Sequence, residues 1–319
     1  MLVVFFRCMK LQTNIPISPF PVKISYHKSA VFIGSCFASN IGRLMQERKF
    51  SAAVNPFGVV YNPLSLAQSL RRLRQRALFA EKELIVCNDL YTTFFHHSSF
   101  SDADSAIFLQ KANDALKEAS AVFCKAEFVI VSLGTACSYW HEATAMMVNN
   151  CHKLPASQFK RKKLSIEEMT AALAQEIALN DKKTWIFTVS PIRHWKDGAH
   201  ENQLSKAALL LTVEALQQQF PNVYYFPAYE IMMDELRDYR FYAEDMLHPS
   251  AQAVAYIWQR FSEAAFDDET KTIVAELEKI NAAQQHHPLH PETENYRQFM
   301  ENLEKQQQQF RERYPFVKI

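Results

Sequence analysis

The chain has 319 residues, of which 48% are hydrophobic, and its 35 basic and 34 acidic residues leave a net charge of +1. This length and apolar content suit a large core, while the balanced charge does not favour a nucleic-acid partner. No stretch approaches the roughly 20 apolar residues that a membrane-spanning helix needs, so we expect no membrane partner.

Short apolar runs alternate with amphipathic stretches through most of the chain. Strands are predicted at residues 31–35, 51–54, 128–133, 185–190 and 223–226, and helices near residues 37–49, 63–76, 102–123, 166–179 and 201–219. Apolar strands separated by helices are typical of a parallel sheet covered on both faces, so we expect an α/β fold. Residues 84–100 and 138–153 interrupt this alternation and are predicted to form small β insertions.

The character of the sequence changes near residue 266, where charged and glutamine-rich helix patterns begin at 267–283 and 292–313. We therefore expect one α/β domain over residues 10–265 and a C-terminal helical extension over residues 266–319. The extension is predicted either to pack on the core or to mediate self-association into a homo-oligomer. A partly ordered, solvated end is the third interpretation.

The first residues and the cysteines bear on the cellular compartment. Residues 1–8 lack the charged region and cleavage site of a signal peptide, and Met9 looks like a more natural start, so we expect residues 1–8 to be dispensable. The 6 cysteines are scattered, which indicates reduced thiols in a cytoplasmic protein. Neither these cysteines nor the 11 histidines have a metal-binding spacing, so no metal and no other cofactor is expected.

A candidate nucleophile follows the first predicted strand, where Gly34 and Ser35 close an apolar run and precede a helix. The carboxyl ends of parallel strands face the crevice in which open α/β sheets bind ligands, and helix N–H groups there can bind an oxyanion. Much later in the chain, Asp245 and His248 supply an orienting acid and a base. A serine hydroxyl needs both groups to act as a nucleophile near neutral pH.

Each of these residues also has a simpler interpretation. Ser35 suits the N-cap of the following helix, and His248 with Pro249 suits the start of another. The thiol of Cys36 is a rival nucleophile, because the start of a helix lowers the pKa of a thiol, or it turns into the core.

Several short blocks of the chain resemble a known family. The run from Gly34 to Ala38 carries the Gly-Ser-Cys-Phe-Ala signature of the GSCFA family, which belongs to the SGNH hydrolase superfamily. Further blocks follow in the expected order at residues 55–58, 132–136, 150–153, 190–195 and 245–249. The resemblance covers roughly residues 10–315.

The resemblance implies a flavodoxin-like three-layer α/β/α sandwich with a central parallel sheet. It also implies that Ser35 is the nucleophile, His248 the base and Asp245 its orienting acid. Gly58 matches a glycine whose backbone N–H donates to the oxyanion, and we expect the N–H groups of Ser35 and Gly58, with Thr135, to hold it. In the third block, Gly134 and Thr135 precede Ala136, where the superfamily has the asparagine of its oxyanion hole.

The missing asparagine leaves three possibilities: Thr135 replaces it, another polar group such as His194 does, or nothing does. Losing one oxyanion donor costs on the order of a hundredfold in rate. Four further residues are candidates for the pocket. Asn55 lies in the second block, Arg193 and His194 follow a predicted strand and suit an anion or carbonyl group, and His152 follows an inserted hairpin.

We expect a cytoplasmic esterase that removes an O-acyl group, for example acetyl, from a sugar or small metabolite through an acyl-enzyme on Ser35. The expected partner is therefore a small-molecule or carbohydrate ester. An acyltransferase of the same mechanism and a catalytically weak binding module are the alternatives. The absent asparagine favours the binding module, and the retained Ser35, His248 and Asp245 favour the enzyme.

Overall fold

A computed structural model describes residues 12–286, 288 and 290–319. The prediction that residues 1–8 are dispensable lies outside these ranges. Across the described ranges, every helix is too short or too polar to cross a lipid bilayer.

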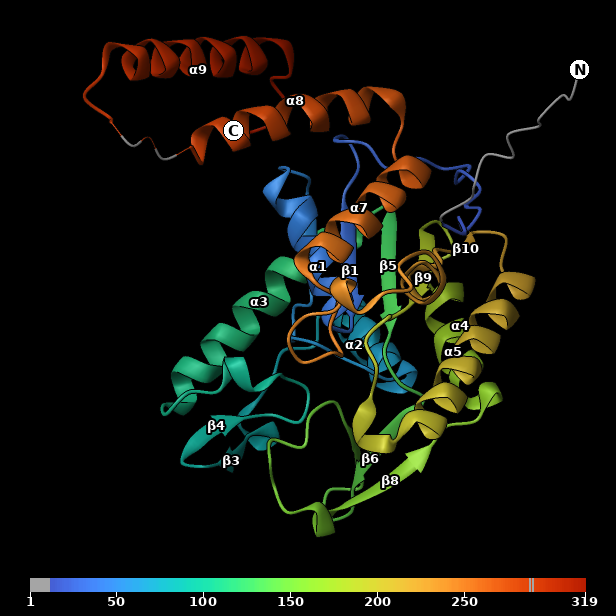
Figure 1. Cartoon of the computed structure of the whole chain (residues 1–319). Coiled ribbons are helices and arrows are strands. Elements are labelled where there is room, and N and C mark those ends of the chain that lie inside the picture. The colour runs from blue at the N-terminus through green and yellow to red at the C-terminus, as the bar shows by residue number, and fades with distance from the viewer. Residues whose placement is uncertain (1–11, 287, 289) are drawn as a thin grey trace, which may run out of the picture.

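A five-stranded parallel sheet forms the centre of the molecule (Figure 1). Its strands are β1 (Ala30–Gly34), β2 (Ala52–Val54), β5 (Phe128–Leu133), β9 (Thr184–Val189) and β10 (Val223–Tyr225). Their order is β10-β9-β5-β1-β2, so the chain builds the sheet outwards in both directions from the β1–β5 pair. This is the flavodoxin-like strand order, whose crevice opens where the direction of winding changes, between β1 and β5.

Helices cover both faces of this sheet. One face carries α1 (Cys36–Glu47) and α7 (Ala251–Ala265), and the other carries α2 (Pro63–Gln75), α3 (Ser105–Lys125), α4 (Ile166–Ala178) and α5 (Ala199–Gln219). Alternate residues of β1 serve the two faces: Phe32 packs with α1 and α7, whereas Val31 and Ile33 pack with the other group. The predicted three-layer α/β/α sandwich is confirmed.

Two small sheets extend from the carboxyl edge of the central one. The first pairs β3 (Ile85–Cys87) with β4 (Leu90–Thr92), and the second joins β6 (Cys137–His141), β7 (Met146–Val148) and β8 (Phe159–Lys163). Both predicted insertions are confirmed, but β8 was not predicted. Its basic side chains project into solvent from the edge of its sheet, so the sequence has none of the apolar alternation that identifies a strand.

The remaining short elements were also absent from the sequence prediction, because each is at most about one turn long. They are η1 (Glu81–Glu83), η2 (Ser98–Phe100), η3 (Ala156–Gln158), η4 (Trp195–Asp197), α6 (Ala228–Glu230), the π-helix η5 (Ile231–Glu235) and η6 (Tyr239–Phe241).

The C-terminal extension consists of α8 (Asp268–Gln284) and α9 (Glu294–Arg313), which project beyond one end of the sheet (Figure 1). The two helices bury a small core of their own that includes Leu277 and Phe310. Arg48, at the end of α1, donates from Nε to Glu278 of α8 at 2.7 Å, so α8 also contacts the main body. Self-association through these helices stays a prediction.

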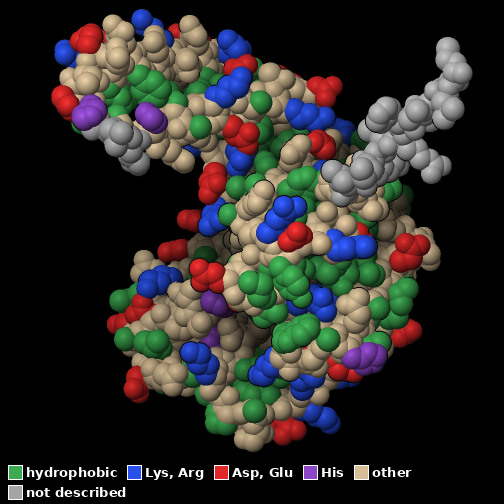
Figure 2. Space-filling model, viewed as in Figure 1, with side chains coloured by type: hydrophobic (Ala, Val, Ile, Leu, Met, Phe, Trp, Pro, Cys, Tyr) green, Lys and Arg blue, Asp and Glu red, His purple; other side chains and the backbone are tan. Residues whose placement is uncertain are grey.

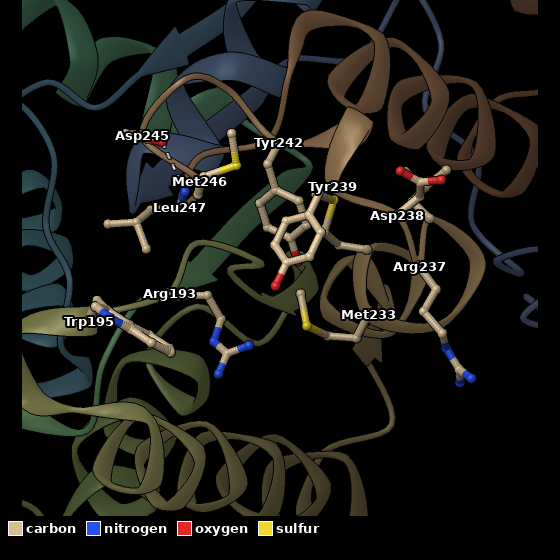
Figure 3. Close-up of a pocket in the computed structure, with 12 residues that line it drawn as sticks. Arg193, Trp195, Met233, Arg237, Asp238, Tyr239, Tyr242, Asp245, Met246 and Leu247 are labelled. Atoms are coloured by element: carbon tan, nitrogen blue, oxygen red, sulfur yellow. Dashed lines mark hydrogen bonds between the residues drawn. The ribbon is translucent and has the colours of Figure 1, made fainter.

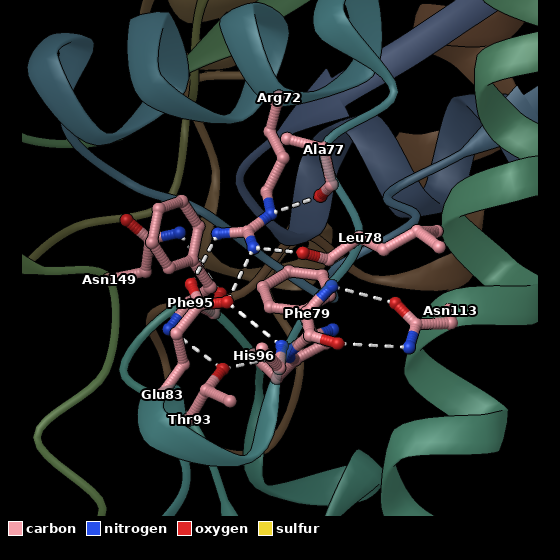
Figure 4. A network of polar contacts seen from close by, with 11 residues as sticks. Arg72, Ala77, Leu78, Phe79, Glu83, Thr93, Phe95, His96, Asn113 and Asn149 are labelled. Atoms are coloured by element: carbon pink, nitrogen blue, oxygen red, sulfur yellow. Dashed lines mark hydrogen bonds and ion pairs between the residues drawn. The ribbon is translucent and has the colours of Figure 1, made fainter.

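Arg72 of α2 attaches the β3–β4 insertion to the core (Figure 4). Its guanidinium donates to the carbonyls of Ala77 and Leu78 and to both carboxylate oxygens of Glu83. The same group lies 3.5 Å from the centre of the Phe79 ring. Paired carboxylate bonding and stacking both suit the flat guanidinium. Asn113 of α3 holds the same segment through the N–H and the carbonyl of Phe79.

His96 is buried beside this network. Its Nδ1 is 2.7 Å from Thr93 Oγ1, and its ring lies 4.4 Å from that of Phe79. Burial, reinforced by the charge of Arg72, lowers the pKa of His96 to about 3. The folded protein therefore keeps this imidazole neutral.

We expect His96→Phe to make stability less sensitive to acid. Between pH 6.5 and about 3 the unfolded chain binds a proton at this position that the folded chain does not, so stability falls as the pH is lowered. Each such proton contributes about 1.4 kcal/mol per pH unit. Urea unfolding at several pH values should show that the free energy of unfolding changes less steeply with pH in the variant, by the equivalent of up to one bound proton. Exposed His200→Asn is the control, and an unchanged slope in His96→Phe would contradict the assignment.

Candidate active site

The turn between β1 and α1 lies where the sheet changes its direction of winding. Gly34 has φ +140°, and a Cβ at this position would lie 2.2 Å from the carbonyl oxygen of Ser132 on β5. The N–H of Gly34 donates to Asn55 Oδ1 at 2.8 Å. Glycine thus allows β1 and β5 to approach at the point where the candidate nucleophile begins.

Ser35 is the N-cap of α1, as one of the two interpretations predicted, and only 1% of the residue is exposed. Its Oγ accepts from the N–H of Phe37 at 3.2 Å and lies 2.9 Å from Ser132 Oγ. Its own N–H donates to the carbonyl of Ser132 at 3.0 Å. Both polar groups of Ser35 are therefore held against the end of β5.

Asp245 organises the turn that carries His248. Its Oδ1 accepts from the N–H groups of Leu247 and His248, both at 2.9 Å, and its Oδ2 lies 2.5 Å from His248 Nδ1. These backbone donors and the imidazole lower the pKa of Asp245 to about 2. Because Nδ1 faces the carboxylate, Nε2 is the nitrogen that His248 has for another partner.

A cavity of about 490 Å³, which we call the central cavity, brings the two parts of the site together. Its lining includes Ser35, Cys36, Tyr61, Thr135, His194 and His248. In this structure Ser35 bonds to Ser132 and Phe37, and His248 bonds to Asp245. The predicted nucleophile and base thus share one cavity, but the hydrogen bond between them is not formed.

The expected oxyanion donors already have partners. The N–H of Ser35 donates to Ser132, and the N–H of Gly58 donates to the carbonyl of Asn55 at 2.7 Å within a tight turn. Thr135 donates its N–H to the carbonyl of Tyr61 at 3.0 Å, and its hydroxyl lies 3.2 Å from Ser205 Oγ. In this structure the turns that hold the strand ends together use these N–H groups, and the oxyanion role of these residues stays a prediction.

Three other candidates have structural roles. The Asn55 side chain bridges the N–H of Gly34 and the hydroxyl of Ser39. Buried His152 lies with Nε2 2.8 Å from the carbonyl of Thr93 and is not part of the lining of the central cavity, so its contact with a substrate stays a prediction. Gly134 lies against Tyr61, where a Cβ would come within 3.1 Å of the Tyr61 carbonyl oxygen.

His194 does line the central cavity, and its ring packs edge-on against that of Tyr61 at 5.7 Å. Burial lowers the pKa of His194 to about 4, and the positive charge of Lys206 is the second cause. The imidazole is therefore neutral at neutral pH. Cys36 lies nearby, with Sγ 3.7 Å from the hydroxyl of Tyr61, so the choice between Ser35 and Cys36 as nucleophile stays open.

Lys206 is a component of the site that sequence reasoning missed. Its buried Nζ donates to the carbonyls of Gly134 and Ser190, each at 2.7 Å, and so joins the ends of β5 and β9. Burial lowers its pKa to about 7. A signal was present in the sequence, because Lys206 shares a helical stripe with buried Asn202 and Leu209, at spacings of four and three residues.

Asn62 was also missed. It is the N-cap of α2 and lines the central cavity. Its Oδ1 accepts from the N–H of Ser65 at 2.9 Å, and its Nδ2 donates to Ser65 Oγ at 3.0 Å. An amide has two N–H groups, so this arrangement leaves one for a ligand.

Metal ligation is not evident in this part of the molecule. Within the described ranges, no three or more His, Cys, Asp or Glu side chains are grouped as metal ligands would be.

Two family models match the sequence. The model of the GSCFA family matches residues 29–261, and that of the GSCFA domain protein, C-terminal domain, matches residues 277–319. The chain belongs to the GSCFA family. Comparison of this GSCFA protein with curated proteins and with solved structures gives no significant match.

The five residues of the GSCFA signature each have a physical role here. Gly34 permits the approach to β5, Ser35 caps α1, and Cys36 lines the central cavity. Phe37 and Ala38 are buried in the core on the α1 side of the sheet. The signature therefore describes one strand-to-helix turn with its reactive side chains facing a cavity.

We expect Gly34→Ala to destabilise this GSCFA protein strongly. The methyl group would collide with the Ser132 carbonyl, and the positive φ adds strain, so the loss in free energy of unfolding should be roughly 3 kcal/mol or more. The matched control is Gly198→Ala, which has φ +81° but no atom within 4 Å of the added Cβ. There the loss should be only about 1 kcal/mol. Equal losses in urea unfolding would show that the β1–β5 contact is not the constraint.

Proposed function

We propose that this GSCFA protein is a serine hydrolase of the SGNH type, which cleaves an O-acyl ester through an acyl-enzyme on Ser35. The observation that carries the proposal is that Ser35 and the Asp245-oriented imidazole of His248 line one cavity at the β1–β5 crevice. A hydroxyl, a base and an acid that fixes the base are the groups required for nucleophilic acyl transfer.

In this mechanism Ser35 exchanges its hydrogen bond with Ser132 for one with His248 when substrate enters. Ser35 Oγ attacks the ester carbonyl carbon while His248 Nε2 takes the hydroxyl proton. The ester C–O bond then breaks, and His248 returns that proton to the departing alcohol oxygen. Water, activated by His248, attacks the acyl-enzyme and releases the carboxylic acid with free Ser35.

Two donors remain for the oxyanion. The N–H of Cys36 is the first of α1 and is among the amides that a helix leaves without an intrahelical acceptor. The second is the Nδ2 of Asn62, whose other hydrogen is engaged by Ser65. In this assignment Asn62 supplies, from the start of α2, the amide that is absent beside Gly134.

The polar lining favours a substrate with hydroxyl groups. Neutral His194 offers a ring nitrogen, and Asn149 and Asn150 lie on the same lining. These groups suit the O-acylated sugar or small metabolite expected from the sequence. An acyltransferase differs only in the acceptor of the acyl group, so it shares every residue of this assignment.

A binding module is the second candidate function. It is favoured by one observation: the Ser35 hydroxyl is bonded to Ser132 and not to His248. In that function the crevice binds the ester without cleaving it.

Covalent labelling separates these functions. We expect a fluorophosphonate to add once to the intact wild-type protein, because only an activated hydroxyl attacks it readily. Intact-mass spectrometry should show no adduct with Ser35→Ala, the same adduct with Cys36→Ala, and much slower labelling with His248→Gln. Labelling lost only in Cys36→Ala would make Cys36 the nucleophile, and an unlabelled wild type would favour the binding module.

Asn62→Ser tests the oxyanion assignment. Serine keeps the N-cap of α2, so stability should be nearly unchanged, but it removes the amide donor. We expect kcat for a 4-nitrophenyl ester to fall by roughly a hundredfold with little change in KM. An unchanged kcat would exclude Asn62 as an oxyanion donor, and unfolding curves provide the control for stability.

A further inference from the structure

A second cavity of about 600 Å³, which we call the apolar cavity, adjoins the turn that carries His248. Its walls come from η5 with the loop that follows it, from Trp195, and from Met246 and Leu247 of the Asp245–His248 turn. Figure 2 shows hydrophobic side chains gathered on this face between α7 and α5. None of the steps proposed above uses this cavity.

Apolar side chains on its rim are unusually exposed. Trp195 is 54% exposed, Tyr239 is 78% exposed and Met246 is 51% exposed. Large apolar groups that remain in water around a hollow mark a binding surface for apolar ligands, because covering them removes their area from water.

The backbone around the apolar cavity is also irregular. Met232 and Met233 lie on η5, which is a π-helix, and such segments occur frequently at functional sites. Met246 has φ +58°, a conformation that costs energy for a residue with a side chain. This conformation lies within the turn that pairs Asp245 with His248. The same strained turn therefore positions the candidate base and forms part of the wall of the apolar cavity.

Arg193 lies at the junction and lines both cavities. Figure 3 shows its guanidinium between the side chains of Trp195 and Met233, which both line the apolar cavity. The guanidinium lies 5.4 Å from the centre of the Trp195 ring, and its Nε is buried without a hydrogen-bond partner. The Arg193 cation therefore lies on the lining of the apolar cavity, and its Nε–H has no acceptor.

The acidic residues of the same lining are engaged elsewhere. Asp245 bonds to His248, and Asp238 forms an ion pair with Arg240 at 3.6 Å. Lys206, the nearby buried cation, donates to the backbone carbonyls of Gly134 and Ser190 and therefore provides no acceptor for Arg193. An anion on the ligand would supply the missing partner, and guanidinium binds carboxylate and phosphate through paired N–H groups.

We propose that the apolar cavity binds an aromatic or branched apolar group of a ligand whose carboxylate or phosphate is held by Arg193. Within the proposed function, on which this identification of the ligand rests, this is the alcohol part of the ester. His248 gives its proton to the departing alcohol oxygen, so the alcohol lies beside the turn that walls the apolar cavity. The substrate class is then an acyl ester of an apolar, anionic alcohol, in preference to a plain sugar acetate.

Binding of 4-phenylbutyrate, with the neutral 4-phenylbutyramide as its matched analogue, tests this proposal without any chemical step. Isothermal titration calorimetry on wild type and on Ser35→Ala should give the same dissociation constant for the acid. The amide should bind about tenfold more weakly, because it lacks the charge that Arg193 recognises.

Three variants locate the binding. Arg193→Gln should reduce the affinity for the acid to that for the amide, and Met233→Trp should fill the cavity and abolish binding of both. Arg43→Gln, which removes an exposed cation of α1 outside both linings, should leave the affinities unchanged. Inorganic phosphate in competition should weaken binding of the acid to wild type but not to Arg193→Gln.

Absence of saturable binding to the folded wild type, equal affinity for acid and amide, or insensitivity to both Arg193→Gln and Met233→Trp would each overturn the proposal. These results are independent of fluorophosphonate labelling. If the protein binds the acid but is never labelled, the ligand site is supported and the hydrolase function is not. If the protein is labelled but does not bind the acid, the hydrolase function is supported and the ligand site is not.

Discussion

The close approach of β1 and β5 at Gly34 is the constraint on which the site depends. With no side chain at this position, the backbone of β1 can lie against Ser132, and Asn55 holds the same turn from the side of β2. The first turn of α1 is thereby directed at the crevice. The cap of α2 at Asn62 and the turn that carries His248 line the same cavity as this first turn.

The same constraint explains why the oxyanion donors expected from the sequence are engaged. Packing strand ends this tightly requires backbone hydrogen bonds across them, and the N–H groups of Ser35 and Thr135 are used for that purpose. Buried amides rarely stay unpaired, so rigid strand ends and free donors compete for the same groups. Donors for a ligand must then come from helix starts, as with Cys36 and Asn62.

Much of the fold was predictable from the sequence, because long apolar runs such as 128–133 identify buried parallel strands without tertiary information. The positions of Ser35, His248 and Asp245 at one crevice followed from a turn after a strand and a short motif. Charged β8 did not follow, because by composition it resembles a solvated segment. Buried Lys206 was missed although its helical spacing to Asn202 and Leu209 was a signal, because a lysine side chain is usually solvated. The acceptor of the Gly58 N–H was also hidden, because the pattern of apolar residues does not show that a tight turn bonds this group to Asn55, three residues earlier. Local pattern thus indicated where the candidate site lies, and hydrogen bonding in the folded chain determines which of its groups are available.

The sheet topology has a consequence for the order in which the molecule forms. Ala30 pairs with Phe128, and the candidate base lies after the last strand of the sheet, so the site joins parts of the chain that are very distant in sequence. Contacts of such long range form slowly, because the entropy of closing large loops must be lost before they stabilise anything. In the proposed mechanism, an unfinished chain emerging from the ribosome would carry Ser35 as an ordinary alcohol, because the candidate base His248 joins the same cavity only in the completed fold. In that mechanism, Ser35 becomes reactive only when the entire domain has folded.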